Sequence, residues 1–528
     1  MIIVSMPSIK RTERGGVIRW DGDDWLKGLS PYFTPTLNLP GGTGLLYNTG
    51  INPFSRPGIL LQGPAPANVT NASVIDAVLK NGVGNGVDAY VIGGTKLHKI
   101  LSSNGAVTNA GAWPHTITAA APNHAGHLSV SGQDTVIYYV GTTKYLFYSW
   151  VDDTDGDIGR YDLSATFDDD FMTTVPSGAL ATGFTNTTLK SIPMIVGDDN
   201  ILYAGNGRYV AAYNGNLATP TINYQALDLP SDYIITSFAK LKNFLVIYAY
   251  KGATNSGGNI YKTETTAFFW DYVSDSFTYA YPLSGNYVNG GFSFNNTVGC
   301  FVYGENYGLG VSPSKNSKLL LFDGEIFKTL VNFSESIPGH GGVETFDNVI
   351  QWNAQGKIYQ YGSPITGVGE GAVNIISSVN GGSTVEGMLR AFSANFHFAS
   401  AGTGTSGGLQ SFNGGTYANA YFLTHITAPP FPEFSQGRIK AVKIFWFGLA
   451  NSGHGFTLNI NTNYGSTSSS VINNSVSITN NITLHTYDVS GNPFPKFEML
   501  QLEGSYTAST VLSIRAVEVY FEDVNINQ

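Results

Sequence analysis

The stretch DTVIYYVGTTKYLFY, residues 134–148, decides the fold, because it places two apolar and aromatic runs around a short turn at Gly141. β-Branched and aromatic residues favour strands, and glycine accepts the positive φ of a tight turn, so the stretch predicts two short antiparallel strands. DNILYAGNGRYVAAY (199–213) and DNVIQWNAQGKIYQY (347–361) repeat the pattern clearly. Looser copies are DAYVIGGTKLHKIL (88–101), NFLVIYAYKG (243–252) and NTVGCFVYGEN (296–306).

The copies of this pattern recur at intervals that indicate one architecture. They start 46, 65, 44, 53 and 51 residues apart. Repeats of about 40–50 residues with a few strands each are typical of propeller blades. We therefore expect residues 66–436 to form a β-propeller of six to eight blades, with elaborated loops such as 151–177.

The composition of the whole chain favours the same fold class. At 528 residues the chain is too long for one ordinary core. Charged residues make up only 12%, while 31 Phe and 30 Tyr stand against six Met, and aromatic rings pack well on pleated sheets. We expect a nearly all-β protein.

The two ends of the chain differ from the middle. Residues 1–65 are punctuated by Gly and Pro, which interrupt helices and long strands, so we expect an irregular N-terminal arm there. In FTLNINTNYG (456–465), Phe456, Leu458 and Ile460 alternate with polar residues. Such alternation buries one face of each strand, and residues 437–528 are therefore predicted to form a C-terminal β-sandwich.

The charge balance limits what the protein can bind. A net charge of −10 argues against a general electrostatic grip on nucleic acid, which needs a basic face. One local exception is the segment from Lys10 to Arg19, which also contains Arg11 and Arg14. We interpret this segment as a solvated arm.

The single cysteine and the hydropathy pattern bear on location. Cys300 has no partner for an intramolecular disulfide, so stability is expected to come from packing or assembly, and synthesis in a reducing cytoplasm is favoured. The start of the chain lacks the apolar run of a signal peptide. No stretch approaches the roughly 18 uninterrupted apolar residues of a membrane helix, so no membrane span is expected.

The segment DDTDGD (152–157) is a candidate metal site. Asp153, Asp155 and Asp157 alternate around Gly156, which resembles the opening of a calcium loop with hard oxygen ligands. No glutamate follows at the spacing of an EF-hand. The alternative is an acidic surface turn, which Asp and Gly form readily.

Motifs with catalytic spacing are missing. The nine histidines show no H-x-x-x-H or H-E-x-x-H pattern, and no Ser-x-Asp-x-Gly-x-Thr-Trp box of sialidase-like propellers occurs. The glycine runs 82–86 and 367–371 lack the Gly-Lys-Ser/Thr that a phosphate loop requires. We therefore predict that the protein is not an enzyme and has no cofactor other than the calcium considered above.

Three segments together resemble the propeller-bearing virion proteins of tailed bacteriophages. They are IRWDGDDWLKGLSP (18–31), KLLLFDGEIFK (318–328) and LSIRAVEVYFED (512–523). The resemblance implies a structural tail protein of the hub or nozzle type, located in the virion and synthesised in the host cytoplasm. It further implies a ring of about six copies around the DNA channel, contacts with other tail or portal-adaptor proteins, and viral DNA that passes without sequence-specific binding.

The resemblance also suggests where neighbouring subunits meet. Trp20, Trp25 and Trp446 are candidate interface anchors, since interfaces favour large aromatic residues. Burial within the same subunit is the alternative for each of them.

Two other functions fit the same residues. The first is a carbohydrate-binding or carbohydrate-cleaving propeller for host-receptor recognition. In that case the aromatic residues of FFWDYVSDSFTYAY (268–281) would stack on sugar rings, while Asp271 and Asp275 would bond their hydroxyls. The second is a scaffold with a peptide-binding propeller face.

Overall fold

The structure is a computed structural model, and almost all of its regular structure is β. It describes residues 8–12, 15–21, 45–49, 51, 60, 62–63, 65, 67–69, 71, 75, 79–102, 105–118, 130–152, 156–172, 191–215, 222–254, 260–304, 317–333, 335–346, 348–354, 356–362, 372–378, 387–391, 395–400, 408–411, 420–429, 431, 435–450, 455–462, 467–473, 482–489, 494–507 and 513–525. Within these ranges lie 38 strands and a 3-10 helix, η2 (His340–Gly342). The prediction of a nearly all-β chain is confirmed.

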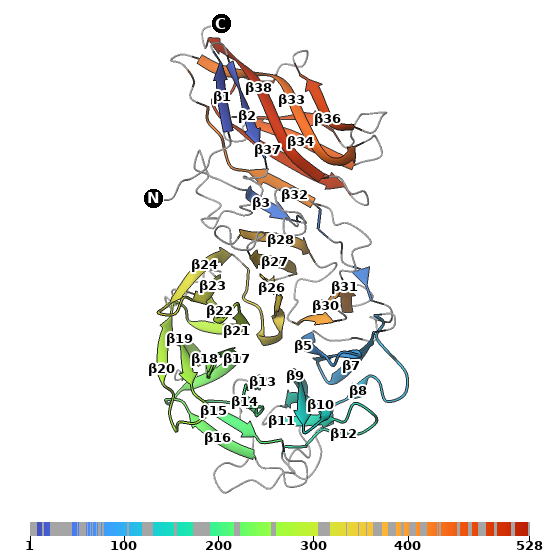
Figure 1. Cartoon of the computed structure of the whole chain (residues 1–528), viewed down its shortest axis with the longest axis vertical. Coiled ribbons are helices and arrows are strands. Elements are labelled where there is room, and N and C mark those ends of the chain that lie inside the picture. Colours follow the sequence, from blue (N-terminus) through green and yellow to red (C-terminus); the bar gives the residue numbers. More distant parts are fainter. Residues whose placement is uncertain are drawn as a thin grey trace. The chain divides into compact units, whose positions relative to one another are not determined.

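Seven four-stranded antiparallel sheets occur among the described residues (Figure 1). The first three are β5 (Leu79–Gly84), β6 (Asp88–Gly93), β7 (Lys96–Leu101) and β8 (His115–Thr116); β9 (Ser131–Val140), β10 (Thr143–Val151), β11 (Gly156–Tyr161) and β12 (Phe167–Asp168); and β13 (Met194–Val196), β14 (Leu202–Asn206), β15 (Tyr209–Tyr213) and β16 (Ile222–Asp228). The next two are β17 (Tyr233–Leu241), β18 (Phe244–Thr254), β19 (Ile260–Trp270) and β20 (Tyr279–Leu283); and β21 (Tyr287–Phe294), β22 (Thr297–Tyr303), β23 (Ser317–Phe322) and β24 (Phe327–Phe333). The last two are β25 (Val343–Phe346), β26 (Val349–Ala354), β27 (Lys357–Gly362) and β28 (Ala372–Ser378); and β29 (Met388–Ala391), β30 (Asn395–Ser400), β31 (Gly408–Ser411) and β4 (Ala67–Asn68).

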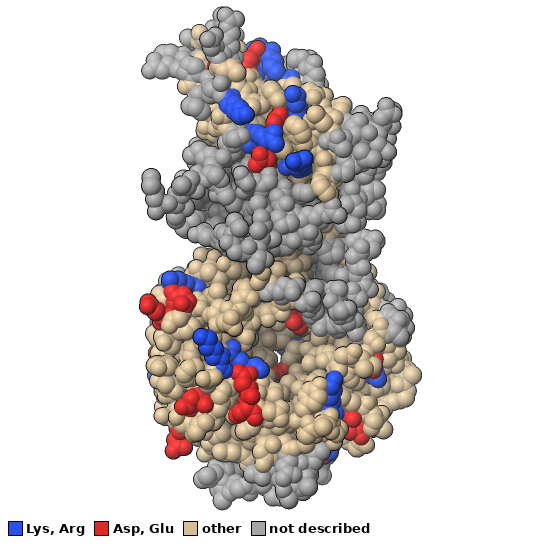
Figure 2. All heavy atoms as spheres, viewed as in Figure 1, with Lys and Arg blue, Asp and Glu red and all other residues tan. Residues whose placement is uncertain are grey.

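The first strands of these sheets form a closed ring. The ring runs through β5, β9, β13, β17, β21, β25 and β29, each strand neighbours the next, and β29 neighbours β5 again. Figure 1 shows β5, β9, β13, β17 and β21 around the middle of this region, and the surface there is hollowed in Figure 2. Radially arranged four-stranded sheets that close on themselves are a β-propeller, so the prediction of a propeller is confirmed.

The last sheet of the ring takes its fourth strand from the beginning of the chain. Strand β4 pairs with β31, with Asn68 opposite Gln410 and Ala67 opposite Ser411. The amide of Gln410 also donates a hydrogen bond to the side-chain oxygen of Asn68 at 3.1 Å. Residues from both sides of the repeat region therefore complete one sheet.

The predicted strand pairs occur, although they do not all occupy the same place in a sheet. The stretch 134–148 forms β9 and β10 around Gly141, whose φ is +63°. The stretches 199–213 and 347–361 instead form the second and third strands of their sheets, with positive-φ Gly207 and Gly356 at the turns. The looser copies 243–252 and 296–306 each contain one strand, β18 or β22.

Two five-stranded sheets lie outside the ring. One has the order β1 (Ser8–Thr12), β2 (Gly15–Trp20), β38 (Ser513–Asn525), β33 (Ser435–Ala450) and β36 (Ile482–Asp488). The other has the order β3 (Leu45–Thr49), β32 (Ala420–Thr424), β37 (Leu500–Thr507), β34 (Gly455–Thr462) and β35 (Thr467–Ile472). Both sheets contribute to one apolar core, in which Val442 and Val519 of the first sheet and Leu458 and Leu502 of the second are fully buried.

The compact units of the chain cross the predicted boundaries. One unit contains residues 1–66, 357–378 and 413–528, and the other contains 67–356 and 379–412. The predicted divisions 1–65, 66–436 and 437–528 are corrected accordingly. The segment 1–65 is also not irregular throughout, because β1 and β2 pair with each other and β2 pairs with β38. In β2, Ile18 and Trp20 alternate with Arg19 and are buried in the shared core, which stabilises the strand.

Candidate binding site

A hollow of about 380 Å³ opens beside the β17–β18 turn of the propeller. Its lining comes from the β17–β18 turn, the β21–β22 turn and the β23–β24 turn, which belong to two neighbouring sheets. The lining residues are Leu241, Lys242, Asn243, Phe244, Asn296, Thr297, Phe322, Asp323 and Gly324. We call this site the turn hollow.

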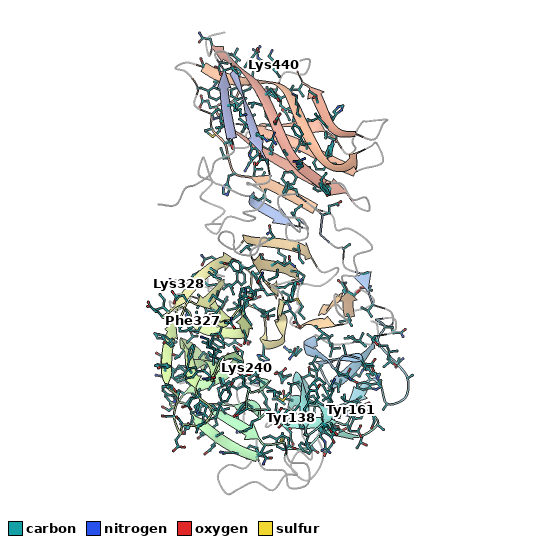
Figure 3. The ribbon with its side chains drawn as sticks, viewed as in Figure 1. Tyr138, Tyr161, Lys240, Phe327, Lys328 and Lys440 are labelled. Atoms are coloured by element: carbon teal, nitrogen blue, oxygen red, sulfur yellow. The ribbon has the colours of Figure 1, made fainter. Side chains whose placement is uncertain are left out.

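Phe244 and Phe322 line the turn hollow, and further aromatic rings lie beside them. The Phe244 ring lies 6.0 Å from that of Tyr279, and the Phe322 ring lies 5.1 Å from those of Tyr281 and Phe327. Tyr279 is 51% exposed, so its ring is accessible to a ligand. Phe327 and its neighbour Lys328 are labelled in Figure 3.

Amide side chains occupy the tips of the turns. Asn295 and Asn296 both have positive φ, at 46° and 61°, which asparagine tolerates better than most residues. The Asn295 amide donates to the Asn348 side-chain oxygen at 3.2 Å, which links the β21–β22 turn to the β25–β26 turn. Asn243 and Asn296 are exposed and present groups that both donate and accept hydrogen bonds.

One carboxylate in the lining is held in its ionised form. Asp323 accepts hydrogen bonds from the backbone N–H groups of Glu325 and Ile326, each at 2.9 Å, and pairs with Lys328. The Ile326 N–H and then Lys328 hold the pKa of Asp323 well below its usual value. The turn hollow thus combines an aromatic wall, two exposed amides and a fixed negative charge.

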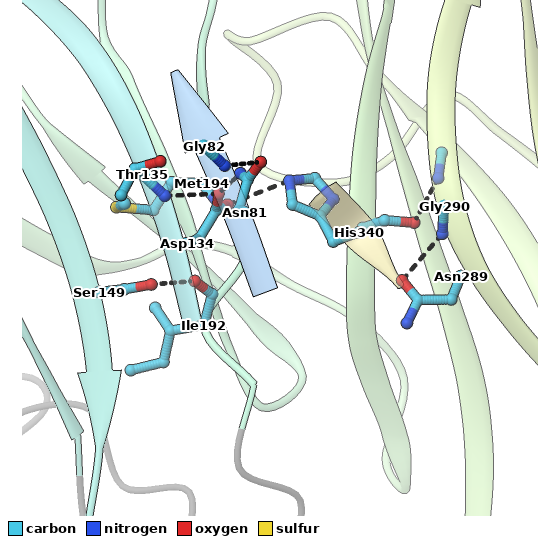
Figure 4. A network of polar contacts seen from close by, with 12 residues as sticks. Asn81, Gly82, Asp134, Thr135, Ser149, Ile192, Met194, Asn289, Gly290 and His340 are labelled. Carbon is cyan, nitrogen blue, oxygen red and sulfur yellow. Dashed lines mark hydrogen bonds and ion pairs between the residues drawn. The ribbon is translucent and has the colours of Figure 1, made fainter. Parts of the chain in front are cut away.

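A second polar cluster lies at the first strands of the ring (Figure 4). The buried Asp134 carboxylate accepts hydrogen bonds from the N–H groups of Thr135 at 2.7 Å and Met194 at 2.6 Å. It also bonds the Asn81 amide and His340 Nε2, the latter at 3.0 Å. These partners come from β5, β9, β13 and η2. We call this cluster the axial clamp.

The axial clamp has the chemistry of a structural contact. A carboxylate offers about four acceptor sites, and Asp134 uses four. Burial lowers the pKa of His340, but the charge of Asp134 and its hydrogen bond outweigh this effect and raise that pKa above its ordinary value. The clamp therefore holds successive sheets of the ring together.

The predicted calcium ligands lie only partly within the described residues. Asp157 is in β11 and fully buried, and its carboxylate accepts the Ile158 N–H at 2.6 Å. Asp153 and Asp155 lie outside the described residues. Over the part of the chain that the structure describes, no group of three or more His, Cys, Asp or Glu side chains is placed to hold a metal ion. Calcium binding stays a prediction.

Two of the three candidate interface tryptophans lie in the core, which is the alternative that the sequence left open for them. Trp20 is 1% exposed and Trp446 is 3% exposed, and both belong to the core shared by the two five-stranded sheets. Their burial follows from strand alternation, because each shares a face with buried aliphatic neighbours. They have no surface to offer another subunit. Trp25 lies outside the described residues.

The aromatic segment 268–281 is mostly core. Phe268, Phe269 and Trp270 are at most 3% exposed, so they cannot stack on a ligand. Asp271 accepts backbone hydrogen bonds from Val273 at 3.0 Å and Ser274 at 2.8 Å, which fixes the turn between β19 and β20. Asp275 and Tyr279 are exposed, and the Tyr279 ring lies 6.0 Å from that of Phe244, which lines the turn hollow.

Sequence analysis missed the rest of the turn hollow and the whole axial clamp. KLLLFDGEIFK (318–328), one of the three segments that carry the virion resemblance, contains Phe322 and Asp323, and the Asn295–Asn296 pair signals a turn. No sequence pattern links these segments to each other. Asp134 and His340 are far apart in the chain, and only the closed ring brings them together.

Comparisons with known proteins bear on the fold. No family model matches the chain, and no curated protein matches it. Among solved structures, the Dos1 propeller matches with a TM-score of 0.37 and 9% identity, over 67% of this chain and 95% of that one. The WD40 domain of Neurospora crassa Pan2 matches with a TM-score of 0.40 and 10% identity, over 64% and 90%. At these identities the similarity concerns the fold alone.

One comparison corrects a sequence-based prediction. A family 43 arabinoxylan arabinofuranohydrolase from Bacillus subtilis, solved in complex with cellotetraose, matches with a TM-score of 0.26 and 11% identity, over 86% of this chain and 98% of that one. A further matched structure is also a glycoside hydrolase. Because enzymes occur among the matched structures, the prediction that the protein is not an enzyme is withdrawn.

The structure also bears on the state of Cys300 and on membrane-spanning helices. Cys300 is fully buried, and burial raises the pKa of its thiol well above the ordinary value. Within the described ranges, no helix has the length and apolar character needed to cross a membrane.

Proposed function

We propose that this protein binds carbohydrate and that the sugar lies in the turn hollow. The observation that supports the proposal is the combination in one hollow of an aromatic wall with exposed amides and a carboxylate. A sugar ring has an apolar face, which packs on aromatic rings, and a rim of hydroxyls that both donate and accept hydrogen bonds. Concave sites with a few convergent polar groups are where small ligands bind.

Different residues of the turn hollow contact the apolar face of the sugar and its hydroxyl groups. Tyr279 and Phe244 offer ring surface to the apolar face of the sugar. Asn243 and Asn296 can bond hydroxyls in either direction. Asp323 stays ionised and acts only as an acceptor.

The proposal is tested with a glycan array followed by calorimetry on the glycans that bind. Substitution Tyr279→Ala removes an exposed ring that lies beside the lining residue Phe244, and we expect it to weaken binding about threefold to tenfold. Asn243→Ala removes one amide and should weaken binding by a similar or smaller factor. Both residues are exposed, so the melting temperature should barely change.

The matched control is Tyr139→Ala. Tyr139 is 44% exposed and lies on β9, in a different sheet. If no glycan binds, or if Tyr139→Ala weakens binding as much as Tyr279→Ala, the turn hollow is not the site. Release of reducing ends from the bound glycans, measured in the same samples, would add hydrolysis to the proposed binding.

We also propose, as a second candidate, that the protein is a tail subunit of a bacteriophage virion. Its support is the sequence resemblance, together with the place of the segments that carry it. In β2 and β38, Ile18 pairs with Val519 and Trp20 with Val517, so the start of the first segment lies on the strand next to the last segment. A ring of about six copies in native mass measurements would support this candidate, and a stable monomer at high concentration would contradict it.

A further inference from the structure

The sheet formed by β1, β2, β38, β33 and β36 has a charged outer face. Its inner residues, such as Ile18, Val442 and Val519, are buried in the core. The alternate residues Arg19, Glu518 and Lys443 form one row across three strands, because Arg19 pairs with Glu518 and Glu518 with Lys443 in the strand register. We call this surface the charged sheet face.

Among the described side chains of the charged sheet face, cations outnumber carboxylates. The cationic side chains that the structure describes there are Lys10, Arg19, Arg438, Lys440 and Lys443. The carboxylates paired with them are Asp21, Glu518 and Glu522. Counting Asp523 at the end of β38 still leaves an excess of positive charge, although the whole chain carries −10. Figure 2 shows Lys and Arg side chains gathered on this part of the molecule, and Figure 3 labels Lys440 there.

The ion pairs hold the cations in place without burying them. Arg19 Nη1 lies 2.6 Å from Glu518 Oε1, and Lys440 Nζ lies 2.8 Å from Glu522 Oε1. Arg19 remains 36% exposed and Lys440 42% exposed. A second anion can therefore still approach these groups from solvent.

Flat rings lie among the cations. Lys443 Nζ donates to the Tyr520 hydroxyl at 3.1 Å and lies 4.5 Å from the centre of that ring. The Arg19 guanidinium lies 5.3 Å from the centre of the Phe445 ring. Beside them, Leu484 is 45% exposed. The surface thus alternates positive charges with apolar area.

We propose that the charged sheet face binds an acidic polysaccharide, a polymer of sugars that carry carboxylate groups. The cations pair with the carboxylates of such a polymer, and the rings accept its apolar sugar faces. The protein's own carboxylates accept its hydroxyls, which the backbone of duplex DNA does not offer. This site lies apart from the turn hollow and does not depend on carbohydrate binding there.

Binding of the full chain to polygalacturonate tests the proposal, with dextran as the neutral polymer and a short DNA duplex as the other polyanion. At about 20 mM salt we expect polygalacturonate to bind and dextran not to bind at this face. At about 300 mM salt, where screening shortens the range of charge interactions, polygalacturonate should bind more weakly. The double substitution Arg438→Gln and Lys440→Gln should weaken polygalacturonate binding about tenfold.

Lys251→Gln is the matched control. Lys251 is 41% exposed and pairs with Glu264 on the propeller, so its loss should leave polygalacturonate affinity unchanged. If the double variant melts abnormally, Lys440→Gln alone gives the result, with an expected loss of about twofold to fivefold. Dextran binding that the double variant weakens as much as polygalacturonate binding, unchanged affinity of the variants for polygalacturonate, or tighter binding of duplex DNA would each overturn the proposal. The turn-hollow variant Tyr279→Ala should keep wild-type affinity for polygalacturonate, which separates the two sites.

Discussion

The substitution Asp134→Asn tests the axial clamp. The Asp134 carboxylate accepts from four donors, including the Met194 N–H at 2.6 Å and His340 Nε2 at 3.0 Å. Asparagine keeps one carbonyl oxygen and replaces the other by an NH₂ group, which cannot accept. About two of the four donors would then face a donor in place of an acceptor.

The expected cost follows from these contacts. Hydrogen bonds to a charged acceptor contribute about 1.5–3 kcal/mol each, and breaking a buried charged pair on one side costs about 3–5 kcal/mol. The first route gives about 3–6 kcal/mol for two lost hydrogen bonds, the second about 3–5 kcal/mol, and we expect a loss of about 3–5 kcal/mol in the free energy of unfolding. That loss is large for a single substitution.

Urea unfolding followed by tryptophan fluorescence measures this loss, because Trp150 and Trp352 of the ring are fully buried. The control is Asp228→Asn. Asp228 is 52% exposed and pairs with Arg208 at 3.0 Å, so its substitution should cost less than about 1 kcal/mol. If Asp134→Asn costs no more than this control, the clamp does not stabilise the ring.

Four further predictions concern the pKa of His340, the burial of Trp446, the pairing of β1 and β2, and the burial of Cys300. The pKa of His340, lowered by burial but raised more by Asp134, gives a stabilisation that is complete below about pH 6.5 and is lost as pH rises through the raised value. The free energy of unfolding should fall over that window in the wild type but not in His340→Gln, and equal pH profiles for the two would contradict this. Trp446→Ala should lower the free energy of unfolding of the two-sheet unit by about 3–5 kcal/mol in denaturant titrations, since Trp446 is 3% exposed. Deletion of residues 1–20 should lower the melting temperature of the same unit, because it removes β1 and β2; an unchanged temperature would contradict the sheet order. Cys300, fully buried and with a raised thiol pKa, should react with a thiol reagent only after unfolding, and rapid reaction of the native protein would refute its burial.

Local patterns predicted the strands well. The turn at Gly141 and the alternation of Phe456, Leu458 and Ile460 both depend on residues close in the chain, and the structure has a turn and a strand where they predict them. The spacing of the repeats and the composition were enough to predict an all-β propeller. Each sheet requires apolar residues in its buried strands and turn-forming residues between them.

Pairings between distant segments could not be predicted in the same way. Strand β4 completes the sheet of β31, and β2 pairs with β38 near the opposite end of the chain. Such pairings depend on complementary edges and buried faces that appear only when the sheets are assembled. For the same reason the sequence left open whether Trp20 contacts another subunit or lies in its own core, and the structure places it in the core.

The turn hollow likewise consists of local features that the sequence predicts and of contacts between distant segments that it does not predict. The Asn295–Asn296 turn and the aromatic segment 268–281 are visible in the sequence. Their meeting with Phe244 and Asp323 around one hollow depends on how neighbouring sheets pack. Sequence patterns find such residues singly, and the packing of the ring gathers them.

An experimental structure of the protein with an oligosaccharide selected on the glycan array tests carbohydrate binding most directly. We predict a sugar ring against Tyr279 and Phe244, with hydroxyls within hydrogen-bond distance of the Asn243 and Asn296 amides. A sugar bound elsewhere on the propeller, with the turn hollow left empty at saturating concentration, would contradict the account.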